Sequence, residues 1–143
     1  MNVASILKEK GGKIITASAN DDITSIAGLL YDKKIGAILI VDSSGAVLGV
    51  LSERDIVSGL ARHGVICMSQ KAEDLMTKNV ITCAPSDTID QVMSLMTTKR
   101  IRHLPVIKDS GLVGFISIGD IVKYRMDEVE REAAAMRDYI ATG

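Results

Sequence analysis

Residues 49–57 read Gly-Val-Leu-Ser-Glu-Arg-Asp-Ile-Val, and residues 114–122 read Gly-Phe-Ile-Ser-Ile-Gly-Asp-Ile-Val. Five of the nine positions are identical at a shift of 65 residues. Closer to the N-terminus, a shift of 66 aligns Ile15 with Ile81 and Asp21 with Asp87. Two copies of one supersecondary unit therefore fill nearly the whole chain, and one residue has been lost between the aligned segments.

Each copy shows the same order of patterns. A short apolar strand, expected at 14–16 and 80–82, leads into polar residues that can cap a helix. A β-hairpin follows that helix, with nearly continuous aliphatic strands, and a closing helix starts at Ser52 or Ser117. The helix after the cap carries apolar residues at i, i+3, i+4 and i+7 in both copies, namely Ile23, Ile26, Ala27 and Leu30, then Ile89, Val92, Met93 and Met96.

A copy of about 65 residues is marginal as an independent core. We therefore predict a mixed α/β (α+β) fold in which two β-α-β-β-α units pack sheet to sheet with pseudo-twofold symmetry. The expected divisions are 1–66 for the first repeat with an N-terminal helix, 67–126 for the second, and 127–143 for a C-terminal helical extension. Residues 63–72 form the linker, and residues 1–10 are expected to form a helix that docks on the pair through Val3, Ile6 and Leu7.

Composition excludes several classes of function. Seventeen basic and eighteen acidic residues give a net charge of −1, so nucleic acid is not an expected partner. The longest apolar run is five residues and no secretory signal is visible, so we expect no membrane span and a cytoplasmic location. Cys67 and Cys83 match neither a disulfide framework nor a metal site, and His63 with Cys67 supplies only two ligands, so no metal is expected.

The repeated motifs resemble tandem cystathionine-β-synthase (CBS) domains. The resemblance also rests on Asp-Leu-Met-Thr at 74–77, Val-Ile-Thr-Cys-Ala-Pro at 80–85 and Arg-His-Leu-Pro-Val-Ile at 102–107, and it covers about residues 3–126. It implies a module that is not an enzyme and requires no cofactor. Such a pair holds AMP, ATP, an adenine dinucleotide such as NAD(H), or S-adenosylmethionine in the cleft between the repeats. Such a pair usually regulates another protein, which is expected here to be a separate polypeptide of unknown identity.

The resemblance also implies roles for particular residues. Asp55 and Asp120 are expected to accept hydrogen bonds from ribose hydroxyls, with Ser52 and Ser117 beside them. The alternative for each Ser-x-x-Asp pair is a capping box at the start of the closing helix. A further set is expected at the adenine edge and comprises Thr16, Ala17, Thr82, Cys83 and Pro85, although Pro85 equally fits a simple turn.

Phosphate contacts are expected from Arg102 and His103, whose counterparts in the first repeat are the uncharged Gly36 and Ala37. A guanidinium binds phosphate oxygens in a bidentate manner, and histidine adds a donor. Arg54 is a second candidate. The alternative for all three is an ordinary solvated surface position.

The C-terminal segment predicts a seam for association. Its apolar residues recur at spacings of 4, 3, 4, 3 and 4, at Val122, Met126, Val129, Ala133, Met136 and Ile140. The helix packs either on its own domain or against a second subunit. Tandem CBS modules commonly form flat twofold dimers, so a homodimer is expected. The competing function is a ligand-independent dimerisation or adaptor module, which would need the helix faces but not Arg102, Asp55 or Asp120.

Overall fold

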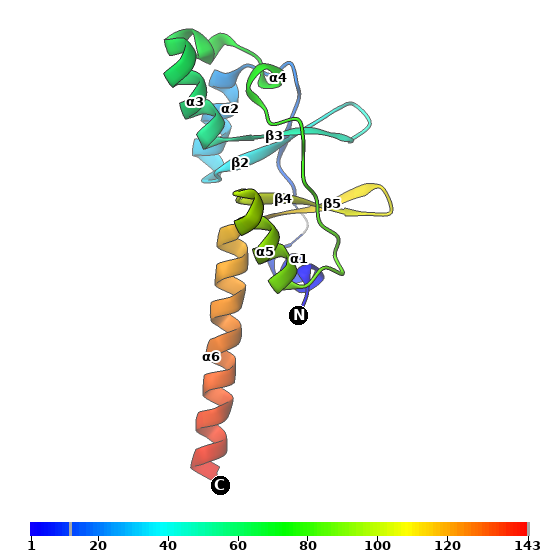
Figure 1. Ribbon diagram of the computed structural model, residues 1–143, viewed down its shortest axis with the longest axis vertical. Helices are drawn as coiled ribbons and strands as arrows, with labels where there is room; N and C mark the ends of the chain where they lie inside the picture. Colours follow the sequence, from blue (N-terminus) through cyan, green and yellow to red (C-terminus); the bar gives the residue numbers. More distant parts are fainter. Residues whose placement is uncertain (12, 143) are drawn as a thin grey trace.

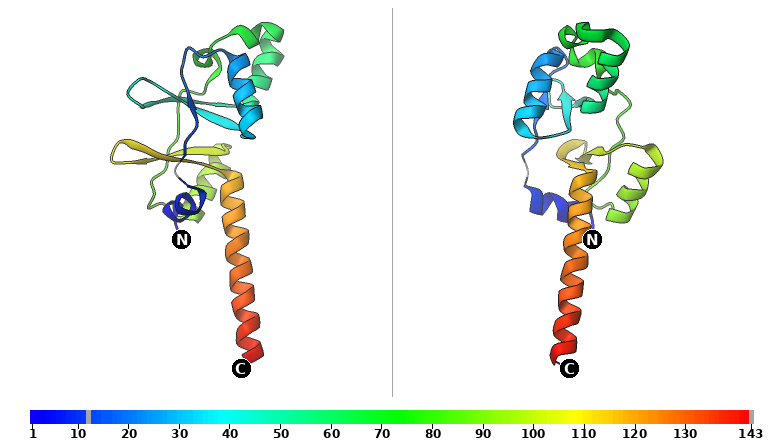
Figure 2. Two further views of the ribbon diagram at one scale, coloured as in Figure 1. Left: turned by 180° about the vertical axis from the view of Figure 1, so that it is seen from behind. Right: turned by 90° about the vertical axis from the view of Figure 1, so that its left-hand side faces the viewer.

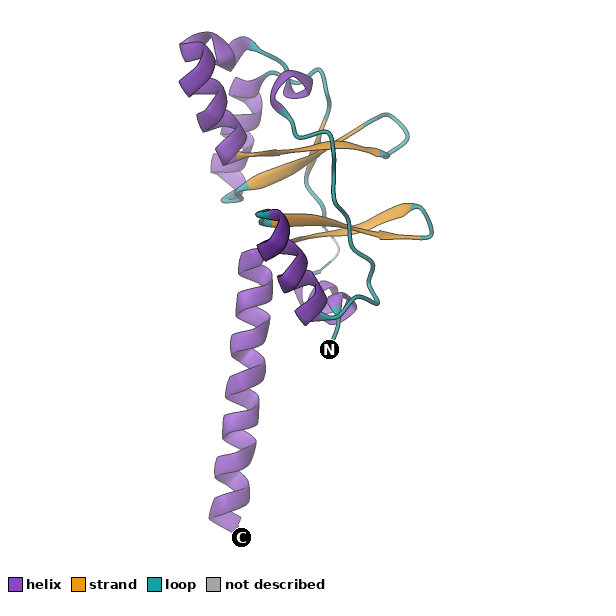
Figure 3. Ribbon diagram, viewed as in Figure 1, coloured by secondary structure: helices purple, strands orange, loops and turns teal. Residues whose placement is uncertain are grey.

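The computed structural model of the chain describes residues 1–11 and 13–142 (Figure 1). Two similar units are stacked, with their hairpins one above the other and their helices on the outside (Figures 1 and 3). The elements in chain order are α1 (Val3–Lys10), β1 (Thr16–Ala17), α2 (Ile23–Lys33), β2 (Ala37–Val41), β3 (Val47–Ser52), α3 (Glu53–His63), the 3-10 helix η1 (Gly64–Ser69), α4 (Ala72–Leu75), α5 (Ile89–Lys99), β4 (His103–Lys108), β5 (Gly111–Ser117) and α6 (Ile118–Thr142).

The two sheets follow the repeat but differ at their first strand. In the first repeat, β1 pairs parallel with β2, and β2 pairs antiparallel with β3. In the second, β4 and β5 form the hairpin, and only Cys83 makes a parallel bridge to Val106. The strand predicted over 80–82 does not form, because the backbone meets β4 only at Cys83, and Val80 and Ile81 line a cleft instead.

The helices that follow the caps form as predicted. The Asp22 carboxylate accepts from the Ser25 backbone N–H at 2.7 Å, and Thr88 and Gln91 form a capping box at the start of α5. The predicted apolar stripes face the interior, and the residues Ile23, Ile26, Leu30, Ile89, Val92 and Met96 are buried. Both helices end on a basic residue in the left-handed conformation, Lys34 and Arg100, each with φ of 55°.

The helix that precedes each repeat in the sequence packs on the other repeat. Val3 and Ile6 of α1 belong to the core of the second repeat, and the Val3 and Ala4 N–H groups donate to the backbone carbonyls of Asp87 and Pro85, each at 2.9 Å. Conversely, Ala72 and Leu75 of α4 lie in the core of the first repeat. The division of the sequence at residue 66 did not predict this exchange, which ties the two repeats together.

Two equivalent glycines permit the exchange. A Cβ atom on Gly49 would lie 2.7 Å from Met76 Sδ and 2.8 Å from the Thr77 carbonyl oxygen. A Cβ atom on Gly114 would collide with the side chain of Leu7. The segment that crosses from the other repeat therefore packs directly on the backbone of β3 or β5, where only glycine leaves room.

Helix α6 extends well beyond the second repeat, and its C-terminal end lies away from both units (Figures 1 and 2). Only Ile121 and Tyr124 of its 25 residues are buried. Among residues 1–11 and 13–142, no helix is long and apolar enough to cross a membrane.

Candidate functional site: a cleft between the repeats

A cleft opens between the first repeat and the segments of the second repeat that precede α5 and β4. One wall comes from β3 and the start of α3, and the other from residues 77–81 and from the turn between α5 and β4. The residues that line it are Val50, Ser52, Arg54, Asp55, Thr77, Asn79, Val80, Ile81, Arg100, Ile101, Arg102 and His103. Five of the predicted site residues thus come together: Ser52, Arg54, Asp55, Arg102 and His103.

Asp55 caps its own helix and keeps one carboxylate oxygen available. Its Oδ2 atom accepts from the Ser52 N–H at 2.9 Å and the Ser52 hydroxyl at 3.1 Å, and the Asp55 N–H donates to Ser52 Oγ at 3.3 Å. The capping box considered from the sequence is therefore present. In the described part of the chain no donor bonds Oδ1, so this oxygen can accept a hydrogen bond from a ligand hydroxyl.

Three arginines give the cleft a positive balance. Arg54 lies in the first turn of α3, while Arg100 and Arg102 come from the turn before β4. None of them takes part in the ion pairs found among the described residues, and Asp55 is the one carboxylate in the lining. Three guanidinium groups around one carboxylate favour a ligand with several negative charges.

Arg100 was missed in the sequence because its counterpart, Lys34, is also basic. A comparison of the repeats points to Arg102, because its counterpart Gly36 is uncharged, but it does not point to a position where both copies carry a cation. The left-handed conformation of Arg100 follows the end of α5 and reverses the chain there, so its side chain reaches the same cleft as Arg102.

His103 lies at the junction of the two repeats. Its ring stacks on Phe115 with 5.6 Å between the centroids. Burial lowers the pKa of His103, and the nearby charges of Arg102 and Lys10 lower it further, against a smaller opposing effect of Asp120. The imidazole is therefore neutral at neutral pH in the unliganded protein, and a bound anion would raise its pKa.

Asp120 and Ser117, the counterparts of Asp55 and Ser52, do not line this cleft. They form the equivalent cap, in which Asp120 Oδ2 accepts from the Ser117 N–H at 2.9 Å. That same oxygen accepts from Lys10 Nζ at 2.8 Å, and Lys10 also donates to the Phe115 carbonyl oxygen at 2.6 Å. Burial alone would raise the pKa of Asp120, but the hydrogen bond from Lys10 and those from Ser117 bring it below its ordinary value.

The residues predicted at the adenine edge do not line the cleft either. Thr16 and Thr82 are exposed, Ala17 is buried in the core of the first repeat, and the Pro85 carbonyl binds α1. Cys83 belongs to the core of the second repeat, where burial raises the pKa of its thiol to about 12. Val80 and Ile81, just upstream, supply the apolar wall of the cleft.

The comparisons identify the family. A family model of the CBS domain matches residues 3–62 and again 72–127. The chain therefore belongs to the CBS domain family and carries two copies of that domain.

Solved structures and curated proteins agree with this assignment. The fold is similar to the CBS-domain protein ATU1752 from Agrobacterium tumefaciens, with a TM-score of 0.86, 42 % identity, and coverage of 87 % of this chain and 99 % of that one. It is similar to the CBS domain pair of protein MJ0100 in complex with 5′-methylthioadenosine and S-adenosyl-L-methionine, with a TM-score of 0.79, 29 % identity, and coverage of 90 % and 98 %. The mitochondrial CBS domain-containing protein CBSX3 of Arabidopsis thaliana is 32 % identical over 149 residues, covering 99 % of this chain and 72 % of that protein.

Proposed function

We propose that this protein is a sensor that binds a phosphorylated, adenosine-containing ligand in the cleft between its repeats. The observation that carries the proposal is the pairing of Asp55, which keeps one free carboxylate oxygen, with the three arginines of the same cleft. The adenosine ligands of the MJ0100 domain pair support the class of ligand.

Each wall of the cleft has a proposed role. Asp55, beside Ser52, binds the ribose diol, since a carboxylate can accept from two adjacent hydroxyls. Arg54, Arg100 and Arg102 bind phosphate oxygens, with His103 as a further donor. The aliphatic Val50, Val80 and Ile81 enclose the adenine ring.

The charge of the cleft favours some adenosine ligands over others. AMP, ATP and adenine dinucleotides present phosphate oxygens to the arginines. S-adenosylmethionine instead adds a sulfonium cation to a site that already carries three. We therefore place AMP, ATP and NAD(H) ahead of S-adenosylmethionine.

The output of the module is regulatory rather than catalytic. Ligand binding biases a homodimer that acts on a separate protein, and the two free cysteines fit a reducing compartment such as the cytoplasm. A ligand-independent adaptor is the second candidate, and the exposed apolar seam of α6 is the observation in its favour.

The test compares AMP with adenosine by calorimetry. Arg102→Ala is expected to weaken AMP roughly ten- to a hundredfold while leaving adenosine nearly unchanged, because a charge-assisted hydrogen bond contributes about 1.5–3 kcal/mol. Asp55→Asn, which keeps a side-chain acceptor for the cap, is expected to weaken both ligands alike. Arg62→Ala, at an exposed arginine of α3 outside the cleft, is the control.

Two results would contradict the proposal. If no adenosine compound at millimolar concentration binds ligand-free protein or raises its melting temperature, the hypothesis of a ligand-independent adaptor replaces that of a sensor. If Arg102→Ala weakens AMP and adenosine equally, this arginine is not a phosphate contact.

A further inference from the structure

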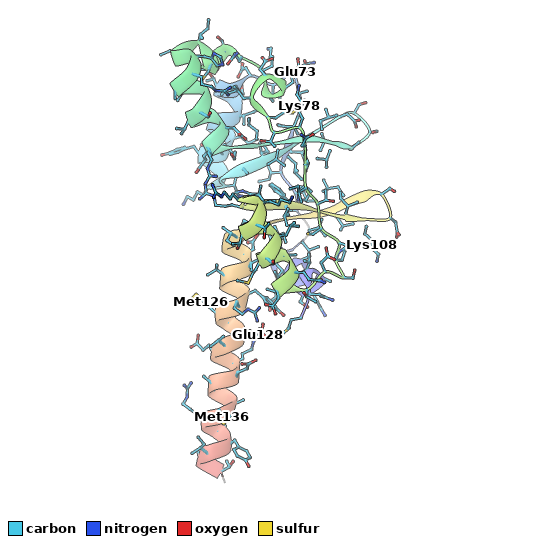
Figure 4. All side chains as sticks on the ribbon, viewed as in Figure 1. Glu73, Lys78, Lys108, Met126, Glu128 and Met136 are labelled. Carbon is cyan, nitrogen blue, oxygen red and sulfur yellow. The ribbon has the colours of Figure 1, made fainter. Side chains whose placement is uncertain are left out.

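The apolar seam of α6 is exposed along its whole length. Its large side chains are between 45 % and 71 % exposed, and they are Val122, Met126, Val129, Met136 and Ile140. Ala133 continues the seam and is exposed as well. Met126 and Met136 mark it in Figure 4, where Met136 lies well beyond the two repeats.

The opposite face of α6 is the one that holds the helix to its own domain. Tyr124 is buried in the core of the second repeat, and the Arg131 guanidinium lies 6.0 Å from the centre of its ring. Arg131 also approaches Glu9 of α1, with 3.9 Å between Nη1 and Oε1. Residues 124 and 131 are one heptad apart, and in a helix they lie roughly opposite the seam. The seam therefore faces away from the chain that carries it.

Charges beside the seam select an orientation for a partner. With Met126, Ala133 and Ile140 at heptad position a, Arg125 and Glu132 occupy g, and Glu130 and Arg137 occupy e. In a parallel pair of identical helices, each g residue faces the e residue five positions later on the other helix. Arg125, which pairs with Asp90 of α5 in its own chain, then also faces Glu130, and Glu132 faces Arg137, so each of these two contacts joins opposite charges.

We propose that α6 pairs in parallel with α6 of a second copy of this chain. The inference rests on the homodimer of the proposed function and adds its orientation. An antiparallel pair that overlaps along the whole seam would set Glu130 against Glu130 and Glu132 against Glu132, which like-charge repulsion disfavours. The parallel pair uses the entire seam, about 27 Å at 1.5 Å per residue, without such a conflict.

A second exposed patch fits the same arrangement. Val57 of α3 is the counterpart of Val122, and together with Leu60, Val65 and Ile66 it is exposed. Helices α3 and α6 lie on the same side of the molecule in every view (Figures 1 and 2). A twofold axis along the paired α6 helices would bring this patch toward the same patch of the second subunit, giving a closed dimer.

Cysteine cross-linking tests the orientation in the full-length protein. Met136→Cys and Val122→Cys are each expected to form an intermolecular disulfide under mild oxidation, because a parallel pair brings identical seam positions together, within the 4.4–6.8 Å between Cα atoms that a disulfide requires. Asp138→Cys, on the outward face, is the matched control and should remain reduced. In the antiparallel pair with full overlap, two copies of residue 136 would lie about 15 Å apart.

Charge reversal provides a second measurement by sedimentation. Glu132→Arg and Arg137→Glu are each expected to raise the dimer dissociation constant roughly five- to thirtyfold, and the double variant should return it to within about threefold of the original. A dimer that forms no cross-link at residues 122 and 136, or a double variant no better than the single ones, overturns the parallel pairing. A monomer at high micromolar concentration overturns the dimer itself, whereas failure of ligand binding alone would leave this result unchanged.

Discussion

Replacing Lys10 by methionine is expected to open a second ligand site beside Asp120. In the structure the Lys10 ammonium donates to Asp120 Oδ2 and to the Phe115 carbonyl oxygen, so a cation lies against this carboxylate, whereas none of the ion pairs among the described residues involves Asp55. We therefore expect one adenosine ligand per chain in the natural protein. Lys10→Met keeps the length and apolar part of the side chain while removing the cation.

The expected change in affinity follows from the contacts of Lys10 that a ligand beside Asp120 must displace. A hydrogen bond to a charged group contributes about 1.5–3 kcal/mol when well shielded. The Lys10 side chain is 39 % exposed and that of Asp120 is 26 % exposed, so solvent screening reduces the cost to about 1–2 kcal/mol. Affinity at the second position should then improve roughly five- to thirtyfold in Lys10→Met.

Calorimetry with adenosine and with AMP measures the stoichiometry directly. We expect one ligand per chain for the natural protein and for Lys8→Met, an exposed lysine of the same helix, and two for Lys10→Met. The gain in affinity at this second position should be larger for adenosine than for AMP, because the counterparts of the phosphate-binding Arg54 and Arg102 are the uncharged Gly119 and Gly36. Two equal sites in the natural protein, or one site in Lys10→Met at millimolar ligand, would refute this account of Lys10.

Two further predictions follow from the core and the junction of the repeats. The folded state lowers the pKa of His103, so the stability that its neutral form supports is complete above about pH 6.5 and is lost as pH falls from there toward the folded pKa. The free energy of unfolding in urea should therefore differ less between pH 5.5 and pH 7.5 for His103→Gln than for the natural protein, and an unchanged difference would exclude this residue as the cause. Gly49→Ala should lower the free energy of unfolding by about 1–3 kcal/mol because the new Cβ meets the Thr77 backbone, whereas Gly28→Ala, at an exposed position of α2 with open space around it, should raise it by about 0.5–1 kcal/mol. Similar unfolding free energies for the two variants would show that the crossing segment moves aside without strain.

The internal repeat predicted the helix, hairpin and closing helix of each copy and the buried faces of α2 and α5, but not η1, α4 or the missing strand at 80–82. Ile23 and Ile89 are both buried, as the shared periodicity indicated, because a helix stripe depends on local spacing alone. The exchange of α1 and α4 could not be predicted in this way. Periodicity shows that Val3 and Ala72 face a core, but not which of two similar cores they face.

The candidate site was predicted in part for a related reason. Asp55 and Arg102 were found because each stands out in sequence, one by repetition and the other by asymmetry. Their meeting in one cleft, which Asp120 does not line, depends on how the repeats are stacked. The residues predicted at the adenine edge lie outside this cleft, since the expected strand is reduced to a single bridge at Cys83, and the preceding Val80 and Ile81 remain free to line the cleft.

The difference between the two carboxylates traces to the length of one helix. The bridges of Asn2 to Thr88 and of Lys71 to Asp22 show that α1 and α4 start at equivalent places, yet α1 runs for eight residues and α4 for four. The additional turn carries Lys10 to Asp120, whereas the chain after α4 becomes extended and pairs with β3 at Thr77. Among residues 1–11 and 13–142, therefore, no lysine of the other repeat forms an ion pair with Asp55. A pseudo-symmetric pair thus acquires one open and one occupied carboxylate from a single turn of helix, and shortening that turn should make the two alike.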